Sequence, residues 1–247
     1  MKEFKHLPGL DLIRVFGILV VVFYHYQVET AVRGLCPADF LPAMEPLVQV
    51  AVYTMTLLSG SCLCWQEKSR SWSMKRYLWG RFLAIYPLFW LCFFPIFIYS
   101  DIICGNNEGV APWKLLLSIV GVDGYFQSFT PTFYKIGEWY LGCILFLYAV
   151  FPVLWRMIRR RGVVFAAVGA LFAWLACCFV ENPGQLYPTL IGQLPLFFMG
   201  IFLGGCLPSL WIPGILAGMT TLVLYSLGCP EYWIVTCLLY TSDAADD

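Results

Sequence analysis

Long apolar runs separated by short polar segments make up most of the chain. The first run extends from Gly9 to Val28, about 20 residues, which at a helical rise of ~1.5 Å per residue crosses a bilayer core once. Strand-type alternation of polar and apolar positions is absent, so helices are expected rather than barrel strands. Later runs predict spans at about 46–65, 78–100, 138–155, 163–180, 191–207 and 211–227, and Tyr232–Tyr240 is long enough for about half a crossing. We therefore predict an all-α, polytopic membrane bundle in which about seven to eight transmembrane helices are present.

The stretch between the third and fourth spans, residues 101–137, does not fit a simple crossing. Its apolar part, 113–122, is too short to span, and one more crossing would place the arginines that follow Phe151 on the wrong side. We expect 113–122 to be an interfacial or re-entrant helix on the outer side. The aromatic-rich loop after it is longer than a connection needs and is long enough to shape a binding site.

Composition identifies a membrane protein. Of the 247 residues, 60% are hydrophobic and only 12% are charged, whereas roughly a quarter of a soluble domain is charged. We expect the lipid bilayer as a partner and no nucleic acid. The eleven cysteines lie mostly inside apolar runs, where they are best interpreted as small apolar residues. No CxxC pair with metal-ligand spacing occurs, so no metal site is expected.

The basic residues predict the orientation of the chain. Eleven of the fifteen lie in three places: Lys2 and Lys5; Lys68, Arg70, Lys75, Arg76 and Arg81; Arg156, Arg159, Arg160 and Arg161. By the positive-inside rule, the N-terminus, 66–77 and 156–162 are cytoplasmic, and 101–137 lies outside. The first run is too long for the core of a cleavable signal peptide and contains Arg14. We expect an integral, multi-pass protein of the bacterial cytoplasmic membrane with a cytoplasmic N-terminus.

The nearly apolar stretch from Leu10 to Tyr26 carries Asp11 and Arg14 at one end and His25 at the other. An arginine inside a membrane segment is costly and is treated as functional by default. Eleven residues, about three helical turns, separate Arg14 from His25, so the two share one helix face ~16 Å apart along the axis. Arg14 has a simpler alternative, an ion pair with Asp11 three residues earlier, and both roles can hold at once. The alternative for His25 is a polar residue hydrogen-bonded to its neighbours at the membrane interface.

Histidine can take up or release a proton near neutral pH, and it can also act as a nucleophile. Glu29, one turn beyond His25, could orient the ring if the helix continues that far.

Two further pairs of residues carry alternatives. Arg76 and Arg81 stand five residues apart near the cytoplasmic end of the third span. They either snorkel to the interface or bind phosphate groups of a cytoplasmic substrate. Ser59 and Gly60 of the second span either let a neighbouring helix approach closely or form the narrow wall of a substrate tunnel.

Four places in the sequence, in this order, resemble the acyltransferase-3 family of polytopic membrane O-acyltransferases. They are LDLIRVFGILVVVFYHY, with its spacing of an arginine, ten residues and a histidine; LLSGSCL; RYLWGRFLAIYPLFW; and GVDGYF followed by IGEWYLGCILFLYAVFPVL. The stretch LPLFFMGIFLG fits a later helix of the family. The resemblance covers residues 7 to about 207. The sequence departs from the family at Ala84, where the family often has a second arginine, and in its number of spans, since about ten are expected.

The resemblance implies transfer of an acyl group, usually acetyl, from cytoplasmic acyl-CoA to a hydroxyl of a saccharide or other cell-envelope acceptor. It implies no permanently bound cofactor, because acyl-CoA is the donor substrate. The site residues that it implies are His25 and Arg14 as catalytic, Asp11, Glu29 and Glu138 as supporting, and Arg14, Arg76 and Arg81 as donor-binding.

Two other functions remain open. One is a transporter or channel whose polar stripe on the first helix lines a solute path, and the other is an inactive, truncated relic. The second is prompted by the last apolar run, which stops at Tyr240 before the polar residues TSDAADD. We expect a membrane acyltransferase domain over 1–240 that is incomplete at its C-terminus, and a polar tail at 241–247 that is either native or spurious.

Overall fold

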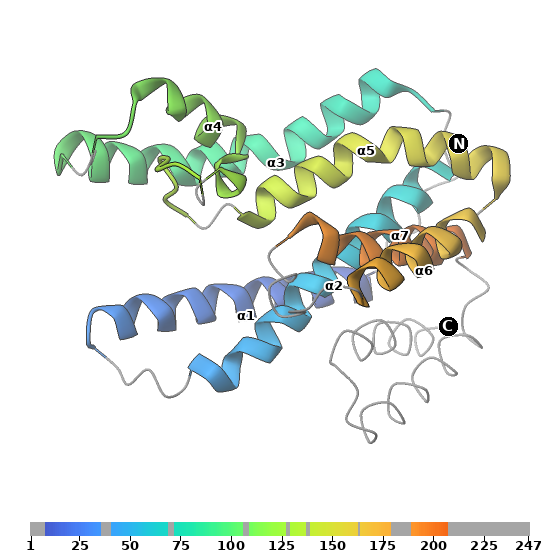
Figure 1. Ribbon diagram of the computed structural model, residues 1–247, viewed down its shortest axis with the longest axis horizontal. Helices are drawn as coiled ribbons and strands as arrows, with labels where there is room; N and C mark the ends of the chain where they lie inside the picture. Colours follow the sequence, from blue (N-terminus) through green and yellow to red (C-terminus); the bar gives the residue numbers. More distant parts are fainter. Residues whose placement is uncertain are drawn as a thin grey trace. The chain divides into compact units, whose positions relative to one another are not determined.

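Seven α-helices follow one another in the described part of the chain, and no strand interrupts them there (Figure 1). The structure is a computed structural model that describes residues 8–35, 41–68, 72–105, 109–126, 129–136, 139–162, 164–178 and 189–206. The helices are α1 (Pro8–Val32), α2 (Leu41–Lys68), α3 (Met74–Phe97), α4 (Leu115–Val120), α5 (Trp139–Arg161), α6 (Val164–Cys178) and α7 (Leu190–Cys206). A π-helix, η2 (Ile98–Ile103), continues α3, and single 3-10 turns form η3 (Pro112–Lys114) and η4 (Asp123–Tyr125). The all-α prediction is confirmed.

Four stretches are long and apolar enough to cross a membrane: Asp11–Val32, Leu47–Lys68, Met74–Ile103 and Trp139–Arg161. They fall on the first four predicted spans. Helices α6 and α7, with 15 and 17 residues, lie on the next two and are shorter than the roughly 20 residues of a typical crossing. The predicted spans at 211–227 and 232–240, and the tail at 241–247, lie outside the described residues. Of the seven to eight predicted spans, six therefore coincide with helices in the described residues.

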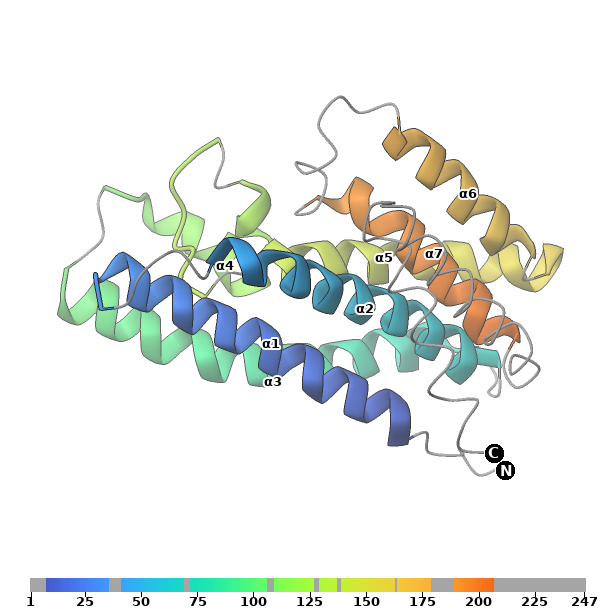
Figure 2. The same ribbon diagram turned by 90° about the horizontal axis from the view of Figure 1, so that it is seen from below.

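The chain divides into two compact units, and each is described by itself. One holds α1, α2, α6 and nearly all of α7; the other holds α3, α4 and most of α5. In the first unit, α1 lies along α2 (Figure 2). Val20 is buried there against Val48 and Ala51, and the end of the Met55 side chain occupies the space beside Gly17. Apolar side chains and Gly17 thus hold the two helices together.

Helices α2 and α7 approach even more closely, at three glycines that leave no room for a Cβ. A Cβ at Gly60 would clash with the backbone of Phe197, one at Gly200 with that of Leu57, and one at Gly204 with that of Ser61. Beside this seam, the Thr56 hydroxyl donates to Gln193 Oε1 at 2.7 Å, and both side chains are fully buried. The interpretation of Gly60 as a helix-packing residue is confirmed.

In the second unit, aromatic rings join α3 to α5. The Tyr77 hydroxyl donates to the Tyr148 carbonyl at 2.7 Å, and its ring stacks on Phe151 with centroids 5.5 Å apart. Towards the other end of α3, Phe93 is fully buried in a cluster with Phe133 of the segment 129–136. The segment 129–136 is therefore packed against α3.

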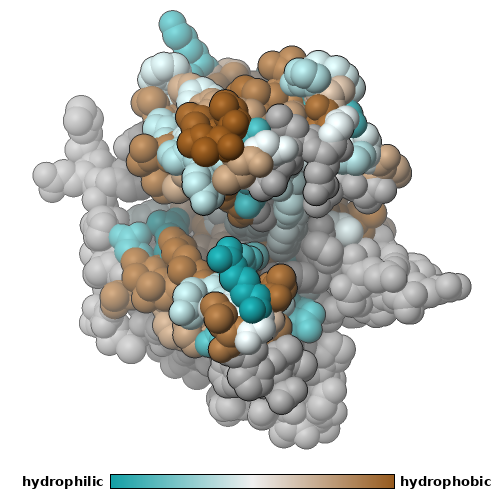
Figure 3. All heavy atoms as spheres, turned by 90° about the vertical axis from the view of Figure 1, so that its left-hand side faces the viewer, coloured by the Kyte–Doolittle hydropathy of each residue, from teal (hydrophilic) through white to brown (hydrophobic). Residues whose placement is uncertain are grey.

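Large apolar side chains cover much of the surface of the spanning helices. Leu12, Leu88 and Leu91, for example, are all more than half exposed. Figure 3 shows apolar side chains at the surface of the face that it views, beside polar ones. A surface of this kind suits lipid contact and is unusual for a protein in water.

Candidate active site on helix α1

Arg14 lies one turn after Asp11 on α1, and its guanidinium group has two partners. Nη1 is 3.0 Å from Asp11 Oδ1, and Nη2 donates to the Cys62 sulfur of α2 at 2.8 Å. The predicted ion pair with Asp11 is confirmed, whereas the contact with Cys62 is not visible in the sequence. A guanidinium has five N–H donors, and 38% of the Arg14 side chain is exposed. The group therefore has capacity left for a ligand.

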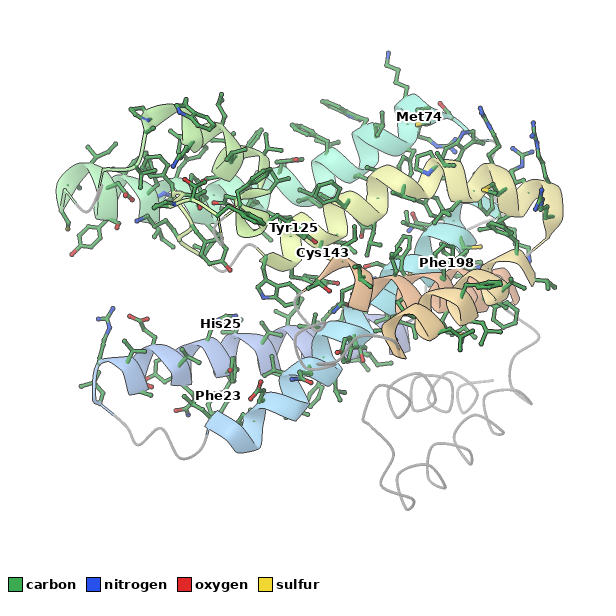
Figure 4. All side chains as sticks on the ribbon, viewed as in Figure 1. Phe23, His25, Met74, Tyr125, Cys143 and Phe198 are labelled. Atoms are coloured by element: carbon green, nitrogen blue, oxygen red, sulfur yellow. The ribbon has the colours of Figure 1, made fainter. Side chains whose placement is uncertain are left out.

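His25 lies about three turns further along the same helix. Because α1 is continuous from Pro8 to Val32, Arg14 and His25 share one helix face ~16 Å apart along the axis. The imidazole is exposed and meets the edge of the Tyr24 ring, with centroids 5.9 Å apart. In Figure 4, His25 and Phe23 project from opposite sides of α1. An exposed imidazole on this helix is open to reactants.

Glu29 pairs with a different residue from the one expected. Its Oε1 accepts a hydrogen bond from Arg33 Nε at 2.7 Å and lies 2.6 Å from Arg33 Nη2. Both contacts use one carboxylate oxygen and neither involves His25, so the supporting role of Glu29 stays a prediction. Glu138, the other supporting carboxylate, lies outside the described residues.

Arg76 lines a pocket at the start of α3. The pocket has a volume of about 500 Å³, and its other lining residues are Ser73, Lys75 and Trp79. Two cationic side chains and an indole are suited to a phosphate-bearing, aromatic ligand. No three His, Cys, Asp or Glu side chains gather in the described parts of the chain.

Arg81, the other predicted donor-binding arginine, faces different surroundings. Its guanidinium carbon lies 5.5 Å from the centroid of the Tyr148 ring of α5, and its Nε is buried. Five residues along a helix correspond to ~140° of rotation, which explains why Arg76 and Arg81 do not line one surface. Both belong to the second unit, whereas Arg14 and His25 belong to the first.

Two lysines hold the segment that precedes α5. Lys135 Nζ lies 3.1 Å from Asp101 Oδ1, and the Asp101 side chain is only 2% exposed. Lys114 Nζ donates to the Thr130 hydroxyl and to the Pro131 carbonyl. The predicted aromatic-rich loop is thus fixed in place at two points.

Asp123 is a buried carboxyl group in this segment that sequence reasoning missed. Its side chain is fully buried in η4, and neither oxygen makes a hydrogen bond of good geometry. Burial raises the pKa of the carboxyl above its ordinary value, and the nearby Ser118 hydroxyl and Gly124 amide offset only part of this shift. The stretch GVDGYF marks the region, but an aspartate beside a glycine is typical of an exposed turn. The sequence therefore gives no signal of its burial.

Comparisons with known proteins point to one family. The sequence profile of the acyltransferase domain family, Acyl_transf_3, matches residues 7–243. Acyltransferase MdmB of Streptomyces mycarofaciens is 26% identical over 191 residues, which cover 71% of this chain and 47% of that protein. The chain thus spans about half the length of this relative, and no solved structure gives a significant match. Because the family profile covers nearly all of its residues, the chain belongs to the acyltransferase-3 family of membrane acyltransferases.

Proposed function

We propose that the protein is a membrane-bound O-acyltransferase. It moves an acyl group, acetyl in the simplest case, from cytoplasmic acyl-CoA to a hydroxyl of a cell-envelope saccharide or similar acceptor. The observation that carries the proposal is the placement of Arg14 and His25 on one face of a continuous helix of spanning length. The family match and the name of the Streptomyces relative support acyl transfer.

The spacing of Arg14 and His25 suits the donor. They are separated by ~16 Å along the helix axis, and a pantetheine arm is an extended, mostly neutral chain of comparable length. With the nucleotide held at the cytoplasmic end of the helix, the thioester reaches the level of His25. One bound acyl-CoA could then contact both residues.

His25 supplies the proton transfer. The acceptor oxygen attacks the thioester carbonyl while the imidazole takes the hydroxyl proton. The carbon–sulfur bond breaks, and the departing CoA thiolate receives the proton. In a second version, the imidazole first accepts the acyl group and then passes it to the acceptor. Both versions need an accessible imidazole, and the exposed His25 ring provides one.

Arg14 holds the donor. Its ion pair with Asp11 and its bond to Cys62 fix the guanidinium group at the start of the spanning stretch. From there it donates charge-assisted hydrogen bonds to a phosphate or carbonyl oxygen of acyl-CoA.

Within its own unit, the pocket at Arg76 suits a nucleotide such as that of acyl-CoA. Lys75 and Arg76 attract phosphate groups, and the Trp79 indole can stack on a base. The donor contact of Arg81 stays a prediction, since its guanidinium packs over the Tyr148 ring.

The orientation that we propose has the N-terminus in the cytoplasm of a bacterial cell. Helix α2 ends at Lys68, and the last turn of α5 carries Arg159, Arg160 and Arg161. Basic residues at these helix ends favour a cytoplasmic location for both. Arg14 would then face the donor side of the membrane, and His25 the acceptor side.

Transfer of labelled acetyl groups tests the proposed function. Membranes that contain the protein should incorporate radioactive acetyl from acetyl-CoA into an envelope fraction, and membranes that lack it should not. A transporter or channel would move a solute without incorporating the label. Equal incorporation in both membranes would contradict the proposal.

A further inference from the structure

Helix α4 ends beside the middle of α3. The Tyr86 hydroxyl donates to the Val120 carbonyl at 3.1 Å, and Trp90 Nε1 donates to the Ile119 carbonyl at 2.9 Å. Within the stretch Met74–Ile103, Tyr86 lies ~18 Å from one end and ~25 Å from the other. If that stretch crosses a hydrocarbon core of ~30 Å, Tyr86 and Trp90 lie deep inside it. Of the two alternatives for this segment, interfacial and re-entrant, this geometry favours the re-entrant one.

The chain reverses its direction directly after α4. Gly121 has a φ of 79°, in the left-handed region that suits glycine, and its amide bonds to the carbonyls of Leu117 and Ser118. The next turn packs on the start of α5, where a Cβ at Gly124 would crowd the backbone of Trp139. The protein therefore encloses this irregular backbone, as the interior of a membrane requires.

Asp123 stands at this reversal in surroundings that disfavour charge. Asp123 and Ser118 are both 0% exposed, and the serine hydroxyl lies beside the carboxyl group. The titratable group nearest to Asp123 in sequence is the Tyr125 phenol, which interacts with the Cys143 thiol of α5, and neither group supplies a positive charge. An unpaired carboxylate is costly in such a place, whereas a carboxylic acid needs only hydrogen-bond partners.

We propose that residues Pro112 to Phe126 enter the membrane from the outer side, and that Asp123 at the tip is an uncharged carboxylic acid whose O–H donates a hydrogen bond to the Ser118 hydroxyl oxygen. This bond joins the last turn of α4 to η4 across the reversal at Gly121. Asp123 is then a positioning residue, which holds the tip and, through Gly124, the first turn of α5. The inference depends on the outer location of 101–137 and not on acyl transfer, so either can fail alone.

The depth of the tip can be measured with a nitroxide. An unnatural amino acid that carries the spin label is placed in turn at positions 126, 88 and 102, whose native side chains are all exposed. Position 88 lies between Tyr86 and Trp90, and position 102 lies in η2. In lipid vesicles, the rate at which the label collides with oxygen is divided by the rate at which it collides with a water-soluble nickel complex. This ratio should be similar at positions 126 and 88, and several-fold lower at position 102. A label at 126 that behaves like the one at 102 would overturn the re-entrant assignment.

The protonation state can be tested by matched substitutions. Asp123→Asn keeps the size, the neutrality and the hydrogen bonding, so at about pH 4, before the parent loses stability to the raised pKa, its Tm in detergent should stay close to that of the parent. Asp123→Leu and Ser118→Ala should each lower the Tm by several degrees. The variant with both Asp123→Leu and Ser118→Ala should have a Tm no lower than that of Asp123→Leu alone, because both changes remove the same hydrogen bond.

Infrared spectra provide a second measurement that does not depend on folding of the leucine variant. The parent should show the carbonyl band of a protonated carboxylic acid, and Asp123→Asn should lose it. Absence of that band from the parent, or an Asp123→Asn protein as unstable as Asp123→Leu, would show that a charged carboxylate is needed and would end the proposal.

Discussion

Arg14 places a positive charge in a spanning helix, and two neighbours explain how it is accommodated. Asp11 lies one turn earlier on α1, so their pairing follows from the sequence spacing alone. Cys62 lies 48 positions away on α2, and only the packing of α1 on α2 brings its sulfur within 2.8 Å. A local pair could therefore be predicted from the sequence, whereas the contact between helices could not.

Removing the Arg14 guanidinium should weaken donor binding. Arg14→Ala should reduce the affinity for acetyl-CoA by about 1.5–3 kcal/mol, the value of a charge-assisted hydrogen bond. Arg14→Lys should restore only part of it, because a point charge replaces a planar fork. Calorimetry on purified protein gives the affinities, with the exposed Arg156→Ala as a control for loss of positive charge. Unchanged affinity in Arg14→Ala would remove Arg14 from the donor site.

Asp123 should make stability depend on pH. Because its pKa is raised in the folded protein above the ordinary value of 3.8, the folded state binds this proton more tightly than the unfolded chain. Folding then takes up a proton, and stability falls as the pH rises from about 4 through the raised pKa.

Asp123→Asn cannot titrate and should lack this loss. The difference in Tm between Asp123→Asn and the parent should therefore increase with pH in thermal scans across the acidic to neutral range. A difference that stays constant over that range would show that Asp123 does not titrate abnormally.

At the level of the helices, the seam between α2 and α7 depends on residues without side chains. Gly200 has no room for a Cβ, because one would clash with the backbone of Leu57. Gly80 of α3 has nothing within 4 Å of the position of a Cβ. The two glycines therefore form a matched pair of helical positions, of which Gly200 has no space for a methyl group and Gly80 has space for one.

Gly200→Ala should destabilise the protein by roughly 1–3 kcal/mol, because one of the helices must move away. Gly80→Ala should leave stability unchanged or raise it by about 0.5–1 kcal/mol, since alanine is the better helix former. Thermal unfolding in detergent compares the two. Equal effects would show that close approach at Gly200 does not matter.

The helices were predictable because a bilayer requires long apolar runs. The first six predicted spans coincide with helices, although α1 continues four residues beyond the predicted Val28. The position of 113–122 was not predictable, because its contacts with Tyr86 and Trp90 are about 30 residues away in sequence. The same holds for the buried pair of Thr56 and Gln193, separated by 137 residues.

For the whole molecule, the orientation in the membrane is the prediction that connects both ends of the site to their substrates. It assigns the start of α3 to the cytoplasm and the end of η2 to the outside. Cys104 and Lys75 are exposed at these two places.

A membrane-impermeant maleimide should modify Cys104, retained as the single cysteine, in intact cells. A cysteine introduced at position 75 of an otherwise cysteine-free protein should react only after permeabilisation. Detergent-solubilised protein controls for the reactivity of each thiol. Modification of position 75 in intact cells would reverse the proposed orientation.

The central claim is that His25 performs the chemistry, and side-by-side measurement of acetyl transfer and acetyl-CoA binding for His25→Ala tests it most directly. Loss of a general base should lower turnover by roughly 10²–10⁴ and leave donor affinity nearly unchanged. Tyr26→Ala, a change to the next exposed residue of α1, should transfer acetyl at the parent rate. A His25→Ala protein that transfers acetyl as fast as the parent would contradict the assignment and the acyltransferase mechanism built on it.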